Sequence, residues 1–166
     1  MKDNKKFSDL LVEKSNLTRT IVTTDGEHDD MNSFRHLLLY ANELDIAGLV
    51  YSSSCHHWSG DEKKHRMKEV IDSYKGESGY PGVEDTGNLI QFRHEPVEWM
   101  EDIILNDYAE VYPNLLKHDP NYPTPGDLWA LTAVGNIKFE GDYRFDTEGS
   151  DLIKEALLDD DERNLY

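Results

Sequence analysis

The sequence predicts an α/β domain built on a parallel, Rossmann-like sheet, and three adjacent segments carry that prediction. Residues 18–23 (TRTIVT) are rich in β-branched side chains, which favour a strand. In residues 31–44, apolar side chains recur at helical spacing. Residues 46–52 (IAGLVYS) lack polar alternation, as expected for a strand covered on both faces. A strand, a helix and a strand within about 35 residues form a βαβ unit with parallel strands.

The rest of the chain is predicted to be mostly helical. We expect a surface helix over 62–75, a loop over 76–95, a long helix from Pro96 through Leu115, and a short helix over 150–158 capped by Ser150. Three prolines predict an irregular loop over 119–127. Two strands are few for so many helices, and residues 164–166 lie where a further strand should begin. We therefore expect a single, truncated three-layer domain over 1–166, with 1–17 as an N-terminal extension.

Composition excludes several partners. The 34 acidic and 17 basic residues give a net charge of −17, which repels the phosphate backbone of nucleic acids. No segment is apolar enough for a membrane span or a signal peptide, so we expect a cytoplasmic protein without a membrane partner. Cys55 is the only cysteine, so an intrachain disulfide is impossible.

An acidic loop follows the first predicted strand and holds Asp25, Asp29 and Asp30. Ligand sites of open parallel sheets lie at the carboxyl ends of their strands, which is the position of this loop. A hard divalent cation would relieve the repulsion among the three carboxylates. Gly26 would let the backbone turn so that Asp25 and Asp30 converge. The spacing fits equally well a strand-to-helix turn whose aspartates cap the helix, so both interpretations stay open.

Two other interpretations of the loop fail on position. An EF-hand would place glycine at Asp30 and a glutamate near Arg35 or His36. A phosphatase of the haloacid dehalogenase type would need a nucleophilic aspartate where Thr23 stands.

The chain resembles a known family over several stretches, from Thr18 to its last residue. The run IVTTDGEHDDMNSFRHLLLYANELDIAGLVYSSS resembles the N-terminal signature of nucleoside hydrolases. It is closer still to the nucleoside-hydrolase-like family sometimes labelled cellulose-binding protein or domain of unknown function. The later stretches VYPNLLKHDPNYPTPGDL, VGNIKFEGD and DTEGSDLIKEALL are similar to that family as well.

The resemblance implies a role for each aspartate of the loop. Asp25 matches the family aspartate that contacts calcium and activates the attacking water, so it is the expected catalytic residue and a metal ligand. Asp30 matches a second calcium ligand, and Asp29 matches a neighbour that binds a sugar hydroxyl. Thr23 replaces the first aspartate of the signature. Ser54 and His56 occupy the place of an expected asparagine, and we expect them to line the same substrate pocket.

The implied function is hydrolysis of an N-glycosyl or related sugar bond with a calcium-bound water. The alternatives are a non-catalytic carbohydrate-binding relative and an incomplete fragment. The family takes further calcium ligands from later strands, so this chain should bind calcium weakly and gain little stability from it. A second chain or a homo-oligomer would complete the fold, and the ligand would be a small sugar or nucleoside.

Other notable side chains receive structural interpretations. Cys55, His56 and His57 are adjacent but lack a second cluster, which favours a loop over a zinc site. Trp58 is predicted to anchor the next helix, with sugar stacking as the alternative. Trp99 and Tyr108 are predicted to lie in the core. A second acidic loop is predicted to be solvated; it holds Glu140, Asp142, Asp146 and Glu148.

Overall fold

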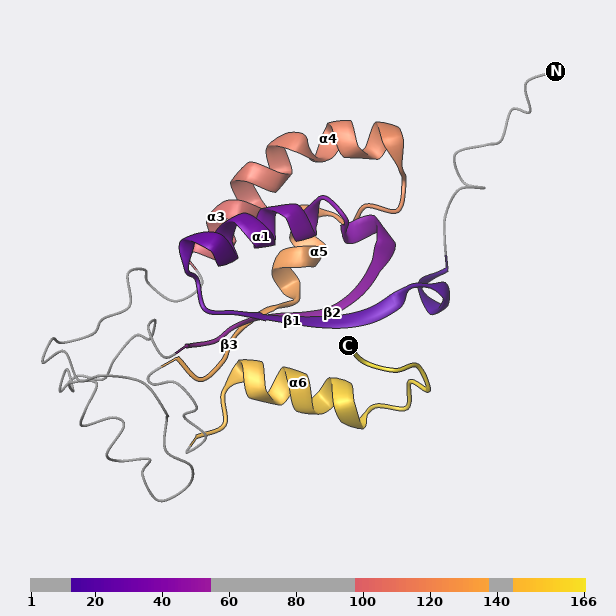
Figure 1. Cartoon of the computed structure of the whole chain (residues 1–166). Coiled ribbons are helices and arrows are strands. Elements are labelled where there is room, and N and C mark those ends of the chain that lie inside the picture. The colour runs from indigo at the N-terminus through magenta and orange to yellow at the C-terminus, as the bar shows by residue number, and fades with distance from the viewer. Residues whose placement is uncertain (1–12, 55–97, 138–144) are drawn as a thin grey trace, which may run out of the picture.

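A computed structural model describes residues 13–54, 98–137 and 145–166. Its three strands are β1 (Thr18–Thr24), β2 (Leu44–Tyr51) and β3 (Thr132–Val134), and they form a parallel sheet in the order β1-β2-β3. Figure 1 shows α1, α3, α4 and α5 on one face of the sheet and α6 on the other. The predicted three-layer α/β architecture is therefore confirmed.

The predicted βαβ unit is present with shifted boundaries. Helix α1 spans His28–Leu38, so it begins three residues before the predicted start and ends six residues before the predicted end. The earlier start places Asp29 and Asp30 in the first turn, where the helix dipole favours negative charge. A 3-10 turn, Ala41–Glu43, then leads directly into β2.

The sequence prediction missed β3, and the shortage of strands that it inferred was partly wrong. β3 has only three residues, too few for a periodic signal, and Leu49 to Tyr51 of β2 pair with it. The strand expected at 164–166 does begin to pair. Leu165 bridges Arg19 in parallel, and the Ile21 N–H donates to the Tyr166 carbonyl oxygen at 2.7 Å. The pairing order therefore reverses at β1, which is where doubly wound sheets form ligand crevices.

The predicted long helix is confirmed for the residues that the structure describes. It comprises α3 (Glu98–Asp102), a π-helical stretch (Ile103–Tyr108) and α4 (Ala109–His118). Its inner face supplies Trp99, Met100, Ile103, Ile104 and Tyr108 to the core, so the core placement of Trp99 and Tyr108 is also confirmed. Pro96 and the predicted elements over 62–95 lie outside the described residues.

Two shorter helices begin differently from the prediction. Helix α5 (Pro125–Ala130) occupies part of the predicted loop over 119–127, because proline is compatible with the first helical position. Thr124 and Asp127 form its capping box. Helix α6 (Glu148–Leu158) is capped by Thr147 and not by Ser150, which is instead the N3 partner of Thr147 in the capping box of α6.

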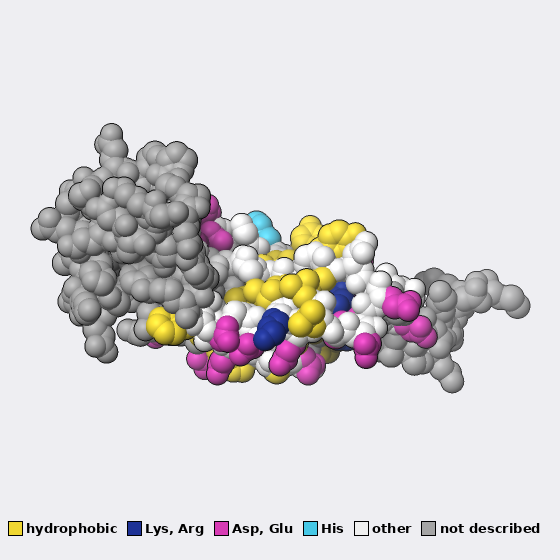
Figure 2. Space-filling view, turned by 90° about the horizontal axis from the view of Figure 1, so that it is seen from below, with side chains coloured by type: hydrophobic (Ala, Val, Ile, Leu, Met, Phe, Trp, Pro, Cys, Tyr) yellow, Lys and Arg dark blue, Asp and Glu magenta, His cyan; other side chains and the backbone are white. Residues whose placement is uncertain are grey.

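Helix α6 lies directly against the sheet. A Cβ atom built on Gly149 would come within 2.6 Å of Val50 and 2.8 Å of the Gly135 backbone, so a side chain there would displace the helix. Figure 2 looks onto this face, where apolar side chains run beside carboxylates. Leu157, Leu158 and Tyr166 are exposed. No described helix is long and apolar enough to cross a bilayer.

Charged side chains gather at the amino ends of β1 and β2, in what we call the amino-edge ion cluster: Lys14, Arg19, Asp45, Asp159, Asp161 and Arg163. Arg163 joins Asp45 and Asp161 at 2.7 and 2.6 Å, and Arg19 pairs with Asp159. The cluster ties the segment after α6 to both strands.

Candidate functional site

The acidic loop leaves the carboxyl end of β1, as the sequence predicted. Asp25 directly follows β1, and Gly26 next to it has a φ of 76°, in the left-handed region that glycine tolerates best. The Glu27 N–H donates to Asp25 Oδ1 at 3.1 Å, which fixes that carboxylate over the turn. The turn thus feeds the chain into α1 with Asp25 facing the start of the helix.

Asp25 and Asp30 form an acidic pair. The Thr24 hydroxyl donates to Asp30 Oδ1 at 2.9 Å and holds this carboxylate beside the end of β1. Burial raises the pKa of Asp30, and a side-chain hydrogen bond with Asp25 together with the charges of Asp25 and Asp29 raises it further. The bond from Thr24 acts in the opposite direction. Asp25 and Asp30 are both half-buried, and the neighbouring Asp29 is exposed.

Three aromatic rings pack beside the turn that carries this pair, and we call them the aromatic floor: Phe34, Tyr51 and Trp99. A Cβ atom on Gly26 would lie 2.8 Å from Trp99 Nε1 and 3.1 Å from Tyr51 Cε2. The Tyr51 ring meets the Trp99 ring edge-on at 5.8 Å, and Phe34 meets Trp99 at 5.4 Å. All three rings are buried. The sequence prediction recognised Trp99 as a core residue but gave no sign of its contact with the acidic loop.

Polar groups from β2 and β3 line the same edge of the sheet. The Ser52 N–H donates to the Thr24 carbonyl oxygen at 2.7 Å, and the Ser53 hydroxyl donates to the Asn136 carbonyl oxygen at 3.0 Å. A cavity of about 210 Å³ opens there, lined by Thr23, Val50, Ser52, Ser53, Gly135, Asn136, Ser150 and Ile153. The sequence prediction missed Asn136, because the short β3 that places it was missed.

Of the other predicted site residues, only Ser54 lies within the part of the chain that the structure describes. Ser54 is half-buried and lies three residues beyond β2, at the same edge as Asp25. His56 and the possible zinc donors Cys55 and His57 lie outside the described residues, as do Trp58 and part of the second acidic loop. Within the described part of the chain, no three His, Cys, Asp or Glu side chains are grouped to hold a metal ion. A cation at the acidic pair would therefore need oxygen atoms of other kinds as well.

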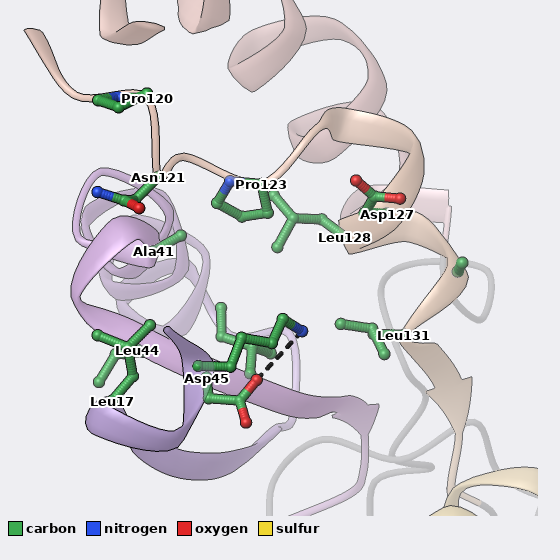
Figure 3. A pocket seen from close by; sticks show the side chains of 13 residues that line it. Leu17, Ala41, Leu44, Asp45, Pro120, Asn121, Pro123, Asp127, Leu128 and Leu131 are labelled. Carbon is green, nitrogen blue, oxygen red and sulfur yellow. Dashed lines mark ion pairs between the residues drawn. The ribbon is translucent and has the colours of Figure 1, made fainter. Parts of the chain in front are cut away.

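Another cavity, of about 620 Å³, lies at the opposite edge of the sheet. Its wall includes Leu17, Leu44, Leu128 and Leu131 (Figure 3). The dashed line in Figure 3 marks the ion pair between Asp45 and Lys14, at 3.2 Å. This wall is mainly apolar and its Asp45 already pairs with cations, so the acidic pair is the stronger candidate for chemistry.

Comparisons with known proteins agree with the α/β fold. Residues 19–166 match the family model described as cellulose-binding Sde182, nucleoside hydrolase-like domain. Among solved structures, the chain is similar to a nucleoside hydrolase-related hypothetical protein from Saccharophagus degradans that is associated with carbohydrate metabolism, with 28% identity and a TM-score of 0.60. The match covers 90% of this chain and 29% of that protein, so the chain spans less than a third of its relative. No curated protein matches the chain.

Proposed function

The chain belongs to the cellulose-binding Sde182, nucleoside hydrolase-like domain family, and on that premise we propose that it binds a sugar at its acidic pair with the help of a calcium ion. We further propose that this site hydrolyses an N-glycosyl or related sugar bond. The ligand is then a small sugar or nucleoside, in keeping with the acidic surface that disfavours nucleic acid.

The observation that carries the proposal is the approach of Asp25 to Asp30. Burial raises the pKa of Asp30, and the neighbouring Asp25 carboxyl raises it further, because two such groups oppose each other's ionisation. Such a cost is typical of functional sites. Carboxylate oxygens are the ligands that calcium prefers, so Asp25 and Asp30 suit this ion. When bound, calcium would supply positive charge for sugar hydroxyls and acidify a nearby water.

The side chains of the loop suit the steps of such a hydrolysis. Water attacks the anomeric carbon, the bond from that carbon to the base nitrogen breaks, and the base leaves with the electron pair and takes up a proton. Asp25 accepts the proton that the water loses. Asp29, exposed beside the pair, binds a sugar hydroxyl, and Ser54 contributes from the end of β2. His56 belongs to the proposed substrate site from the sequence resemblance alone.

A non-catalytic sugar-binding role is the second candidate. Thr23 replaces an acidic residue at the end of β1. It lines the small cavity together with several serine side chains and Asn136. The description of the family as cellulose-binding favours the same role. Both candidates use the acidic pair, and they differ only in whether a bond is broken.

A calcium titration followed by NMR tests the shared part of the proposal. We expect the Gly26 amide signal to shift saturably, with a Kd of about 10⁻⁴ to 10⁻³ M, because two carboxylates supply few of calcium's six to eight ligands. Asp25→Asn should abolish the shift. The matched control is Asp107→Asn, which removes a carboxylate that is 53% exposed and lies on the long helix. An unchanged Gly26 signal well above that concentration range would refute the cation site.

Ligand assays separate the two candidates. Calorimetry with ribose, nucleosides and cello-oligosaccharides, with and without calcium, measures binding, and release of free base measures hydrolysis. Base release that disappears in Asp25→Asn supports the hydrolase. Sugar binding without any bond cleavage supports the binding module, and the absence of both rejects the proposed function.

A further inference from the structure

The two segments that carry the acidic pair, the loop at Gly26 and helix α1, pack against a single indole ring. Trp99 enters from α3 and is 6% exposed. On one side it meets the ring of Phe34, with an interplanar angle of 76°. On the other side it faces Gly26, where a Cβ atom would lie only 2.8 Å from its Nε1 atom.

The Phe34 contact concerns Asp30. Both residues belong to α1, and their separation of four positions places them on the same side of that helix. Packing of Phe34 on Trp99 therefore fixes the depth and rotation of the helix that presents the Asp30 carboxylate. The bond from Thr24 then selects the direction of that carboxylate.

The Gly26 contact concerns Asp25. Gly26 is buried and has its left-handed backbone pressed against Trp99 and Tyr51. Asp25 is the preceding residue, so its backbone position follows from this contact. A shift of the indole would move the two carboxylates relative to each other, because the loop and the helix pack against it separately.

We propose that Trp99 is a positioning residue, which sets the separation of Asp25 and Asp30 and thereby their ability to hold a cation together. The consequence for cation binding rests on the proposed function, whereas the control of carboxylate geometry does not. Trp99 lies beneath the pair and is assigned no contact with the ligand.

Tyr51 supports this arrangement independently. Its side chain is fully buried at the end of β2 and packs edge-on against Trp99. Burial raises the pKa of Tyr51, the neighbouring Trp99 opposes the rise, and the charge of Asp25 adds to it. A Cβ atom on Gly26 would lie 3.1 Å from Tyr51 Cε2, so the Tyr51 ring also packs against the turn that follows Asp25.

The test uses three variants of the full chain. Trp99→Leu removes both ring contacts, Trp99→Phe keeps an aromatic edge, and Met100→Ala is a control on the same helix, since Met100 is fully buried. The readouts are the ¹³C shifts of the Asp25 and Asp30 carboxyl carbons without added cation, and the Kd for calcium from the Gly26 amide. Loss of a group that orients metal ligands weakens metal binding about tenfold to a hundredfold.

We expect Trp99→Leu to move both carboxyl signals and to raise the calcium Kd by about tenfold or more. Trp99→Phe should restore most of the affinity, and Met100→Ala should leave the affinity of its folded fraction unchanged. Equal weakening by Met100→Ala, or unmoved carboxyl signals in Trp99→Leu, would overturn the positioning role. If Trp99→Leu does not fold, the same readouts on Phe34→Leu decide: a moved Asp30 carboxyl signal with a raised calcium Kd supports the positioning role, and an unmoved Asp30 signal overturns it.

The two readouts also separate this inference from the proposed function. If the unmodified chain binds no calcium but Trp99→Leu still moves both carboxyl signals, the cation site fails and the positioning role stands. If the unmodified chain binds calcium and Trp99→Leu binds it equally well, the positioning role fails and the cation site stands.

Discussion

The two edges of the sheet use aspartate in opposite ways. In the amino-edge ion cluster, Asp45 pairs with Lys14 at 3.2 Å and with Arg163 at 2.7 Å. Hydrogen bonds from Arg163 lower the pKa of Asp161 in the same cluster. At the carboxyl edge, burial raises the pKa of Asp30, and the groups that act on it are a hydroxyl and two further aspartates.

This difference distinguishes carboxylates that stabilise the fold from the acidic pair, which we propose binds a ligand. A carboxylate whose charge is matched by arginine is already satisfied, and removing its partner leaves an uncompensated charge. A pair that repels itself lowers stability unless something else binds there, and proteins tolerate such a pair mainly where function requires it. The amino edge is therefore structural, and the carboxyl edge is the place to look for chemistry.

The largest effect is expected from Gly26→Ala at the carboxyl edge. The left-handed backbone costs a residue with a Cβ atom about 1–2 kcal/mol, and contact at 2.8 Å with Trp99 adds about 1–2 kcal/mol. We expect chemical denaturation to show a loss of about 3 kcal/mol together with loss of the calcium response. Gly126→Ala is the control, since its Cβ would meet only Thr124 at 3.9 Å. Equal stability of the two variants would contradict the turn geometry.

A somewhat smaller loss is expected from Arg19→Met at the amino edge. The Arg19 side chain is 8% exposed, and its partners Asp159 and Asp161 are 42% and 28% exposed. Breaking a fully buried pair costs about 3–5 kcal/mol, so partial solvent screening suggests about 2 kcal/mol here. Urea denaturation should show this loss with an unchanged calcium Kd.

Arg35→Met is the control for that experiment. Arg35 and Asp107 are 45% and 53% exposed, and such surface pairs contribute about 0–1 kcal/mol. If Arg19→Met weakened calcium binding in its folded fraction, the two edges would not be independent.

The edges also differ in how far the sequence could predict them. The acidic loop spans six residues, so its motif, the strand before it and the helix after it were visible in one stretch of sequence. The amino-edge ion cluster joins residues more than a hundred positions apart, such as Asp45 and Arg163, and no local pattern marks them. Surface charges of this kind are ordinary in an acidic chain, and only the tertiary fold pairs them.

Within the site, local motifs predicted the acids but not their support. Trp99 has the spacing of any core residue on a helix, and its contact with Gly26 depends on how α3 packs against the loop. Asn136 depends on β3, whose three residues are too short for a period-two pattern. Proline misled the prediction at α5, because Pro125 begins that helix and does not interrupt it.

A gain of stability is expected from Asp30→Asn. At neutral pH the charged Asp30 carries the cost of burial and of repulsion by Asp25, which asparagine removes while still accepting from Thr24. Relieving one unfavourable charge typically adds about 0.5–2 kcal/mol. Thermal unfolding should show a higher Tm than for the unmodified chain, without any calcium response.

The pH dependence gives the sign of this effect. The folded pKa of Asp30 is raised, so its contribution to stability is fully present below the unfolded pKa and is lost as pH rises through the folded value. The advantage of Asp30→Asn should therefore be greatest at neutral pH and vanish in acid. An advantage that persists at the acid end would mean that charge is not its cause.

The smallest expected effect is the stabilisation of the unmodified chain by calcium. When the calcium concentration equals Kd, binding to the folded state alone adds RT ln 2, about 0.4 kcal/mol. For a chain of 166 residues this corresponds to a rise in Tm of about 1–2 °C. Acidification should remove the rise, because protons compete for Asp30 at a pH above the ordinary aspartate range. Arg19→Met should keep the rise, since the carboxylates at the amino edge have cations of their own, whereas a rise that survives in Asp25→Asn would place the calcium elsewhere.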